Sequence, residues 1–159
     1  MNVRPHVYAT RLRWSGAASG ATTSYKTYSR DYTIEADGRP ELRGSADAHF
    51  LGDATRYNPE DLLVAALSAC HLLSYLAECA RAGIAVVAYE DDAHGEMTVI
   101  DGVMRFSEVV LHPKVAIADE TRLDEAVALH ERAHALCLIA NSVNFPVHHE
   151  PVVTAGQPV

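Results

Sequence analysis

Two cysteines in unlike settings are the residues of this chain best suited to chemistry. Cys70 lies inside an apolar run, NPEDLLVAALSACHLLSYL, and Cys137 follows a histidine-containing segment, HERAHAL. Such thiols meet only through tertiary structure, and each is then either packing material or a nucleophile. The sequence therefore carries two hypotheses for the pair, a thiol enzyme and two inert cysteines.

The composition predicts one domain over residues 1–159 that binds neither nucleic acid nor membranes. Apolar residues make up 48% of the chain, which is enough for one core. A net charge of −8 opposes attraction to nucleic acid or to anionic lipid. The N-terminal residues lack the apolar core of a secretion signal, and no run approaches the roughly 20 apolar residues of a membrane span. We expect a cytoplasmic protein, in which an odd count of 3 cysteines argues against a permanent disulfide.

A long helix is predicted to carry Cys70. Asn58 is a good N-terminal cap, Pro59 suits the first helical position, and two acidic residues follow in the first turn. The helix should end near Ala82, with Gly83 as its stop signal. Between residues 62 and 76 it is apolar on nearly every side, so other elements or a partner chain must enclose it. We therefore expect a homodimer.

The remaining segments predict strands and a second helix. Asp101-Gly102 is a typical two-residue hairpin turn between two strand-forming stretches. Residues 119–136 are amphipathic, which predicts a helix that ends beside Cys137. The segments expected to form strands are residues 6–14, 24–36, 41–44, 84–100, 103–117 and 142–153.

A reactive Cys70 would need charged neighbours from outside its own helical turn. It lies too far along the helix for the helix dipole to lower its thiol pKa, so a cation must be brought to it. Arginine suits this role because it stays charged when desolvated, and Arg30, Arg43 and Arg56 are the upstream candidates. Glu60 is the obvious carboxylate, but a continuous helix separates it from Cys70 by about 15 Å. An arginine spans this gap, the upstream loop folds back, or Glu60 of a partner subunit completes the site.

Residues 130–134, HERAH, match the H-E-x-x-H pattern of zinc hydrolases. In that pattern His130 and His134 would bind zinc from one helix face, and Glu131 would act as the general base. Cys137 is the one clear further ligand, placed where a catalytic zinc keeps its open position. The ordinary interpretation is a solvated or interface face of the helix. The adjacent pair His148-His149 should point to opposite faces of a strand and share no metal.

Two segments resemble one known family closely. NPEDLLVAALSACH (residues 58–71) and AHALCLIANSVNFPV (residues 133–147) resemble the OsmC/Ohr peroxiredoxin-related proteins, and YSRDY (residues 28–32) supports the likeness. The resemblance implies an α/β (α+β) fold, with antiparallel sheets around two central helices. It also implies an intertwined homodimer with reactive sites near the interface, and no metal or organic cofactor.

The same resemblance implies a thiol-dependent peroxidase that reduces small organic hydroperoxides. Cys70 would be the peroxidatic thiolate, and Cys137 would resolve its sulfenic acid into a disulfide that a dithiol reductant reopens. Glu60 matches the acidic residue of the family, and Arg30 is the best match for its activating arginine. A non-catalytic, stress-associated dimeric binding module on the same fold is the alternative. The zinc hydrolase is a third hypothesis.

Overall fold

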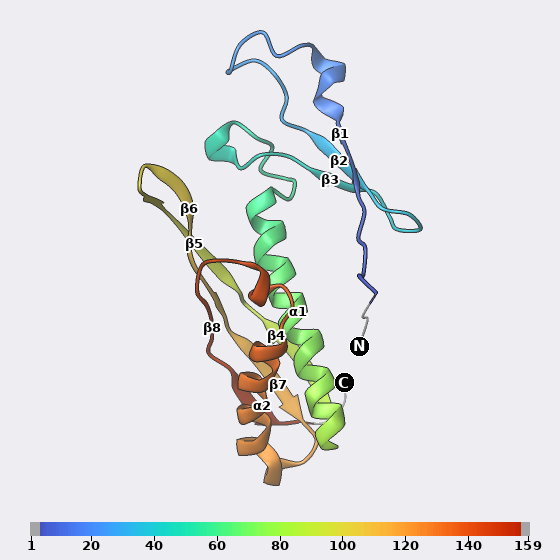
Figure 1. The fold of residues 1–159 in the computed structure, drawn as a ribbon, viewed down its shortest axis with the longest axis vertical. Helices are drawn as coiled ribbons and strands as arrows, with labels where there is room; N and C mark the ends of the chain where they lie inside the picture. Colours follow the sequence, from blue (N-terminus) through green and yellow to red (C-terminus); the bar gives the residue numbers. More distant parts are fainter. Residues whose placement is uncertain (1–3, 157–159) are drawn as a thin grey trace. The chain divides into compact units, whose positions relative to one another are not determined.

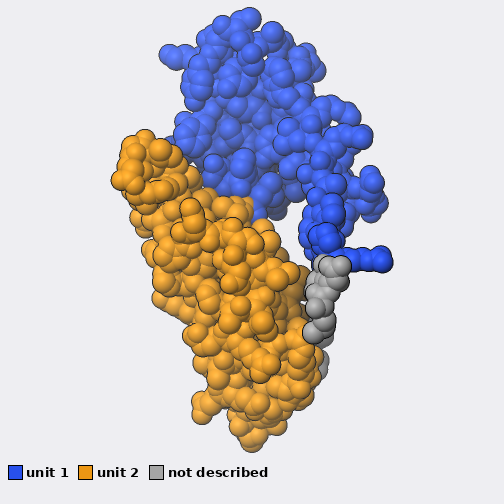
Figure 2. Space-filling model, in the orientation of Figure 1, with its two compact units in different colours: residues 1–62 blue, residues 63–159 orange. Residues whose placement is uncertain are grey.

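The computed structural model describes residues 4–156. Contacts within the chain define two compact units, residues 1–62 and residues 63–159, which Figure 2 colours separately. Each unit is described by itself. The expectation of one domain over residues 1–159 stays a prediction.

Unit 1, residues 1–62, is built on a small antiparallel sheet. Its strands, in the order β1-β2-β3, are β1 (Arg11–Trp14), β2 (Tyr32–Glu35) and β3 (Leu42–Gly44) (Figure 1). The strand β2 is shorter than the stretch predicted for it, because residues 15–31 form a 3₁₀ turn (Ser15–Ser19) and a loop, and β1 begins at Arg11 rather than at residue 6. The indole of Trp14 donates to the Ser29 carbonyl over 2.8 Å and ties this loop to β1. A second 3₁₀ turn spans Ala48–Phe50.

The long helix α1 (Pro59–Ala82) has the predicted bounds. The Asn58 side chain accepts a hydrogen bond from the Asp61 N–H over 2.7 Å, and the Asp61 carboxylate accepts one from the Asn58 N–H over 3.3 Å. This reciprocal arrangement satisfies two backbone donors and fixes where the helix begins. At the other end, Gly83 adopts a φ of 70°, the left-handed conformation that favours glycine after a helix.

Unit 2, residues 63–159, contains two three-stranded sheets. One has the order β4 (Val86–Asp91), β7 (Pro113–Ile117), β9 (Val152–Ala155), and the other the order β5 (His94–Ile100), β6 (Val103–Leu111), β8 (Val147–His149). The pairs β4–β7 and β5–β6 are antiparallel, as predicted. The final strands β8 and β9 pair in parallel with β6 and β7, since the chain crosses over through a helix before it returns to the sheets. The predicted hairpin turn is present, with positive φ at both Asp101 and Gly102.

The second helix, α2 (Leu123–Leu136), follows a 3₁₀ turn at Glu120–Arg122, and a further turn spans Ala140–Ser142. One core cluster lies between α1, α2 and the β4-β7-β9 sheet. It contains Tyr75, Cys79, Ile84, Val115, Ile117, Ala126 and Ala133. A second cluster centres on Leu67, Val109 and Leu111, and Ile139 and Ala140 from the segment after α2 pack against it. The residues that follow α2 are therefore held against α1 by apolar packing.

The exposed face of α1 corrects one expectation from the sequence. By length and composition α1 could cross a membrane, although we expected no such run. The expectation failed because Ser68, His71 and Ser74 are too few to offset the leucines and alanines around them. Within the chain, 28% of its most apolar stretch is buried. The face left exposed is Ala65, Ala69, Leu73, Leu76 and Ala80, at the 4-4-3-4 spacing of one side of a helix.

Candidate active site

The structure brings the two predicted thiols together within unit 2. Cys70 is half-buried on α1, and Cys137, the residue that caps the C-terminal end of α2, is 1% exposed. The two side chains are hydrogen-bonding neighbours, and the N–H of Ile139 donates to the Cys70 sulfur over 3.5 Å. All three cysteines are reduced. The pair therefore meets the first requirement for a disulfide, which is proximity of the two sulfurs.

The two thiols differ in their surroundings. Burial raises the pKa of the Cys137 thiol to about 11, and the neighbouring Cys70 adds to this rise. The N–H groups of Ala140 and Ile139 oppose it, because they stabilise the thiolate. Cys137 is consequently a protonated thiol at neutral pH. Cys79 lies in the core beside Tyr75, and burial raises its thiol pKa as well, so it is a packing residue, as predicted.

The turn after α2 is held in place by Asn141. Its side-chain amide donates to the carbonyls of Cys137, over 2.8 Å, and Ala135, over 3.1 Å. Its backbone N–H also donates to the Cys137 carbonyl over 3.0 Å. These bonds satisfy carbonyls that the end of α2 would leave without partners, and they fix the backbone on which Cys137 sits. Sequence reasoning missed this residue, whose signal was an asparagine in a turn-forming segment.

Arg30 and Glu60 line the same pocket of unit 1. The pocket has a volume of about 480 Å³, and its aromatic lining comes from Trp14, Tyr28, Tyr32 and Phe50. The Arg30 guanidinium donates to the Tyr28 carbonyl over 2.5 Å and lies 4.0 Å from the centroid of the Tyr28 ring.

Each of these two charged groups keeps a polar atom without a partner. Arg30 Nε and Glu60 Oε2 are both buried, and neither has a hydrogen-bond partner among residues 4–156. The carboxylate of Glu60 helps raise the pKa of the Tyr32 hydroxyl, after the larger effect of burial. The pocket therefore offers the cationic Arg30 and two carboxylates, Glu60 and Asp47, in a largely aromatic and apolar setting.

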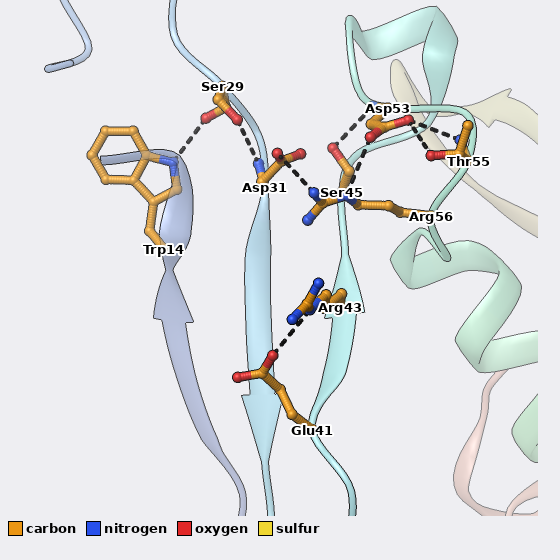
Figure 3. A network of polar contacts seen from close by, with 9 residues as sticks. All are labelled: Trp14, Ser29, Asp31, Glu41, Arg43, Ser45, Asp53, Thr55 and Arg56. Atoms are coloured by element: carbon orange, nitrogen blue, oxygen red, sulfur yellow. Dashed lines mark hydrogen bonds and ion pairs between the residues drawn. The ribbon is translucent and has the colours of Figure 1, made fainter. Parts of the chain in front are cut away.

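The other two candidate arginines are engaged elsewhere in unit 1. Figure 3 shows Arg56 between two carboxylates, 3.2 Å from Asp53 and 3.5 Å from Asp31. Arg43 pairs with Glu41 over 3.2 Å, and its side chain is 73% exposed. Arg30 is thus the candidate that shares a pocket with Glu60. The four predicted site residues form two pairs, one in each unit, and their catalytic roles stay predictions.

A cluster of histidines lies between α1, α2 and β8 in unit 2. His71 and His130 are fully buried, and His71 Nε2 lies 3.0 Å from His130 Nδ1. The His149 ring lies 5.3 Å from the rings of both His71 and His134, and Tyr75 stacks on His130 at 3.8 Å. We call His71, His130, His134 and His149 the histidine cluster.

Burial keeps the two central members of this cluster, His71 and His130, neutral. Burial lowers the pKa of His71 to about 4 and that of His130 to about 3, and charge repulsion from neighbouring histidines adds to both effects. Burial also lowers the pKa of His149. Sequence reasoning missed the cluster, because its members come from three separated segments. The usable signal was a histidine four residues before Tyr75 on an apolar helix.

The H-E-x-x-H segment is therefore placed differently from our expectation. We interpreted residues 130–134 as a solvated or interface face, which is wrong for His130, because it lies on the buried side of α2 with Ala126 and Ala133. Glu131 points outward, is 80% exposed and lies 3.6 Å from His149. Within residues 4–156, no three histidine, cysteine or acidic side chains are arranged to hold a metal ion. As predicted, His148 and His149 point apart, with 57% and 9% of their side chains exposed.

Comparison with known proteins identifies a family. The model of the family described as "OsmC-like protein" matches residues 52–151. The fold is similar to the structure of an OsmC-like protein of unknown function from Vibrio cholerae, which is 32% identical, with a TM-score of 0.85 over 93% of this chain and 100% of that one. An organic hydroperoxide resistance protein from Elizabethkingia anophelis, with thiocyanate bound, is 19% identical, with a TM-score of 0.66 over 96% of this chain and 100% of that one.

A curated relative matches over a shorter stretch. An uncharacterized protein of Bacillus subtilis is 21% identical over 89 residues, which make up 54% of this chain. The match spans 59% of the length of that relative. These likenesses agree with the mixed α/β fold that the sequence led us to expect.

Proposed function

The chain belongs to the OsmC-like protein family, and we propose that it is a thiol-dependent peroxidase that reduces organic hydroperoxides. The observation that carries this proposal is the adjacency of Cys70 and Cys137, two reduced thiols from different helices in one site. Membership of the OsmC-like family supports it, as does the likeness in fold to an organic hydroperoxide resistance protein.

The reaction would proceed in three balanced steps. The Cys70 thiolate attacks the terminal oxygen of the hydroperoxide, the O–O bond breaks, and an alcohol leaves after taking a proton from water. Cys70 is then a sulfenic acid. The Cys137 thiol condenses with it, so that an S–S bond forms and water is released. A dithiol reductant reopens the disulfide by two exchange steps and is itself oxidised to a disulfide.

The surroundings of the two thiols support this division of roles. Cys70 is half-buried, so peroxide can reach its sulfur, and this sulfur accepts a hydrogen bond from the Ile139 N–H. Cys137 is 1% exposed, and its pKa is raised to about 11. A buried, protonated thiol reacts poorly with peroxide but can condense with a sulfenic acid formed beside it.

Arg30 and Glu60 are the groups we propose to complete the site. Arg30 would favour the Cys70 thiolate and stabilise the negative charge on the departing oxygen. Glu60 would orient Arg30. The unpartnered Arg30 Nε and Glu60 Oε2 support this assignment, because buried polar atoms without partners are rare unless a ligand or neighbour satisfies them. The aromatic lining of the pocket suits the apolar substituent of an organic hydroperoxide.

We further propose that two chains form the active unit. Ala65, Ala69, Leu73, Leu76 and Ala80 form a continuous exposed stripe on α1. Small residues at this spacing let two helices pack closely, and an apolar stripe of this kind marks an association surface. Cys70 directly follows Ala69, so it would lie at the edge of the interface. Glu60 is ten residues before Cys70 on the same helix, a rise of about 15 Å, so the partner subunit is the better source of the acid.

The direct test measures consumption of tert-butyl hydroperoxide with dithiothreitol as the reductant. We expect Cys70→Ser to reduce the rate to background, whereas Cys79→Ser, the matched control, should keep the wild-type rate. Stoichiometric peroxide without reductant should produce a Cys70–Cys137 disulfide, detected by mass spectrometry of peptides. Full activity in Cys70→Ser would refute the mechanism. If the wild-type protein neither consumes hydroperoxide nor forms this disulfide, the non-catalytic dimeric binding module becomes the better proposal.

A further inference from the structure

The histidine cluster joins the two helices that carry the thiols. His71 is the residue after Cys70 on α1, and His130 lies on α2, whose last residue precedes Cys137. Besides the contact between the two imidazoles, the Tyr75 hydroxyl on α1 donates to the Ala126 carbonyl on α2 over 3.1 Å. Near the thiols, α1 and α2 are thus joined by polar contacts as well as by the apolar core between them.

The hydrogen bond between the imidazoles needs complementary neutral tautomers. If His71 Nε2 donates, His130 Nδ1 must accept, and the other nitrogen of His130 then carries a buried proton. If the roles are reversed, the other nitrogen of His71 carries it. His71 Nδ1 and His130 Nε2 both lack a partner within residues 4–156, so either choice leaves one buried N–H unsatisfied.

This cost argues that the pair is not there for stability. An unsatisfied buried donor is unfavourable, whereas apolar side chains of similar shape in place of both partners would be nearly neutral. What a directional bond adds over an apolar contact is a fixed geometry. His71 is adjacent to Cys70 on α1, and His130 is on the helix that ends beside Cys137. The geometry of the bond between the imidazoles therefore affects the distance between the two sulfurs.

We propose that His71 and His130 form a positioning pair, whose hydrogen bond fixes α1 against α2 and so holds the Cys137 thiol within reach of Cys70. The pair touches neither peroxide nor sulfur, and it acts through the backbone of the two helices. The proposal rests on the proposed function for its biological meaning, because it concerns the step in which Cys137 resolves oxidised Cys70.

The experiment measures the effective concentration of the two thiols, independently of peroxide. The protein is equilibrated in buffers of reduced and oxidised glutathione, in which the dithiol plus oxidised glutathione gives the Cys70–Cys137 disulfide plus two reduced glutathiones. Two variants are compared with the wild type. His71→Leu/His130→Leu removes the bond and keeps apolar volume. His71→Gln/His130→Asn places an amide group near each bonded ring nitrogen, so that the NH₂ of one can donate to the carbonyl oxygen of the other.

We expect the leucine variant to lose about fivefold in effective concentration, the factor that corresponds to one net hydrogen bond. The amide variant should recover most of this loss. A matched control is His94→Leu/His112→Leu, since those rings also stack, at 5.0 Å, but belong to neither helix. The control should leave the equilibrium unchanged. Urea unfolding is recorded for every variant, because a purely structural role would change stability without changing the thiol equilibrium of the folded protein.

A folded leucine variant with a wild-type thiol equilibrium would overturn the proposal, as would an amide variant as impaired as the leucine variant. If the leucine variant does not fold, His71→Leu alone is measured against the same criteria. If the wild type consumes no hydroperoxide, the proposed function fails, but the glutathione equilibrium still decides whether the histidines position the thiols.

Discussion

Acidification should destabilise unit 2 through the histidine cluster. In the folded protein the pKa values of His71 and His130 are lowered from 6.5 to about 4 and about 3, chiefly by burial. The unfolded chain takes up protons on these residues below pH 6.5, whereas the folded chain does not until a much lower pH. Above pH 6.5 both histidines are neutral in the folded and unfolded states, so they do not change the free energy of unfolding. As the pH falls from 6.5 toward 4, the free energy of unfolding decreases.

The magnitude follows from the linkage between proton binding and folding. Each pH unit below 6.5 costs about 1.4 kcal/mol per imidazole as long as the folded form stays neutral. At pH 5 the cost is about 2 kcal/mol for each residue, or about 4 kcal/mol for the pair. His134 and His149 face the same cluster, and the lowered pKa of His149 acts in the same direction. A loss of about 4 kcal/mol is a large share of the stability of most domains.

The assay is equilibrium urea unfolding at pH 7 and pH 5, followed by circular dichroism. His71→Gln/His130→Asn is the matched variant, because neither new side chain titrates in this range while the carboxylates that also respond to acid are unchanged. The wild type should lose about 4 kcal/mol more than this variant between the two pH values. Equal losses in the two proteins would refute the assignment of a buried, neutral histidine pair.

Two further outcomes test the proposed site. Arg30→Lys keeps the charge but loses the planar group that bonds two carbonyls and stacks on Tyr28, so kcat/KM for tert-butyl hydroperoxide should fall about tenfold or more. The control Arg43→Lys should keep the wild-type value, and equal effects would remove Arg30 from the mechanism. Leu73→Glu places a charge in the exposed stripe of α1 and should give monomers by light scattering, with hydroperoxide activity lost. Val127→Glu, an exposed position on α2, is its control, and a dimeric, active Leu73→Glu protein would contradict the proposed interface.

Local signals predicted the elements that carry the site. The Asn58 cap, the Gly83 stop and the Asp101-Gly102 turn each depend on the conformations of a few adjacent residues, so their consequences were visible in the sequence. The late start of β2 was not, because the loop before it is held by a long-range bond from Trp14 to the Ser29 carbonyl. Pairing of β8 and β9 with β6 and β7 likewise depends on the chain's return after α2.

In the site, too, local features could be predicted from the sequence and contacts between distant residues could not. That Cys70 needed an arginine and an acid could be argued from its depth in the helix. That Arg30 shares a pocket with Glu60, and that Arg56 lies beside Asp31, could not, because these partners are distant in the sequence.

The histidines show most clearly why a motif differs from a site. H-E-x-x-H specifies two histidines on one helical face, but not what that face meets. In this fold it meets α1, and His130 finds His71 and Tyr75 instead of a metal ion. The spacing that would serve zinc binding also places His130 and His134 on the side of α2 that faces β8, where His134 meets His149. The sequence pattern was therefore correct about which side chains share a face, and the partner across that face decided their chemistry.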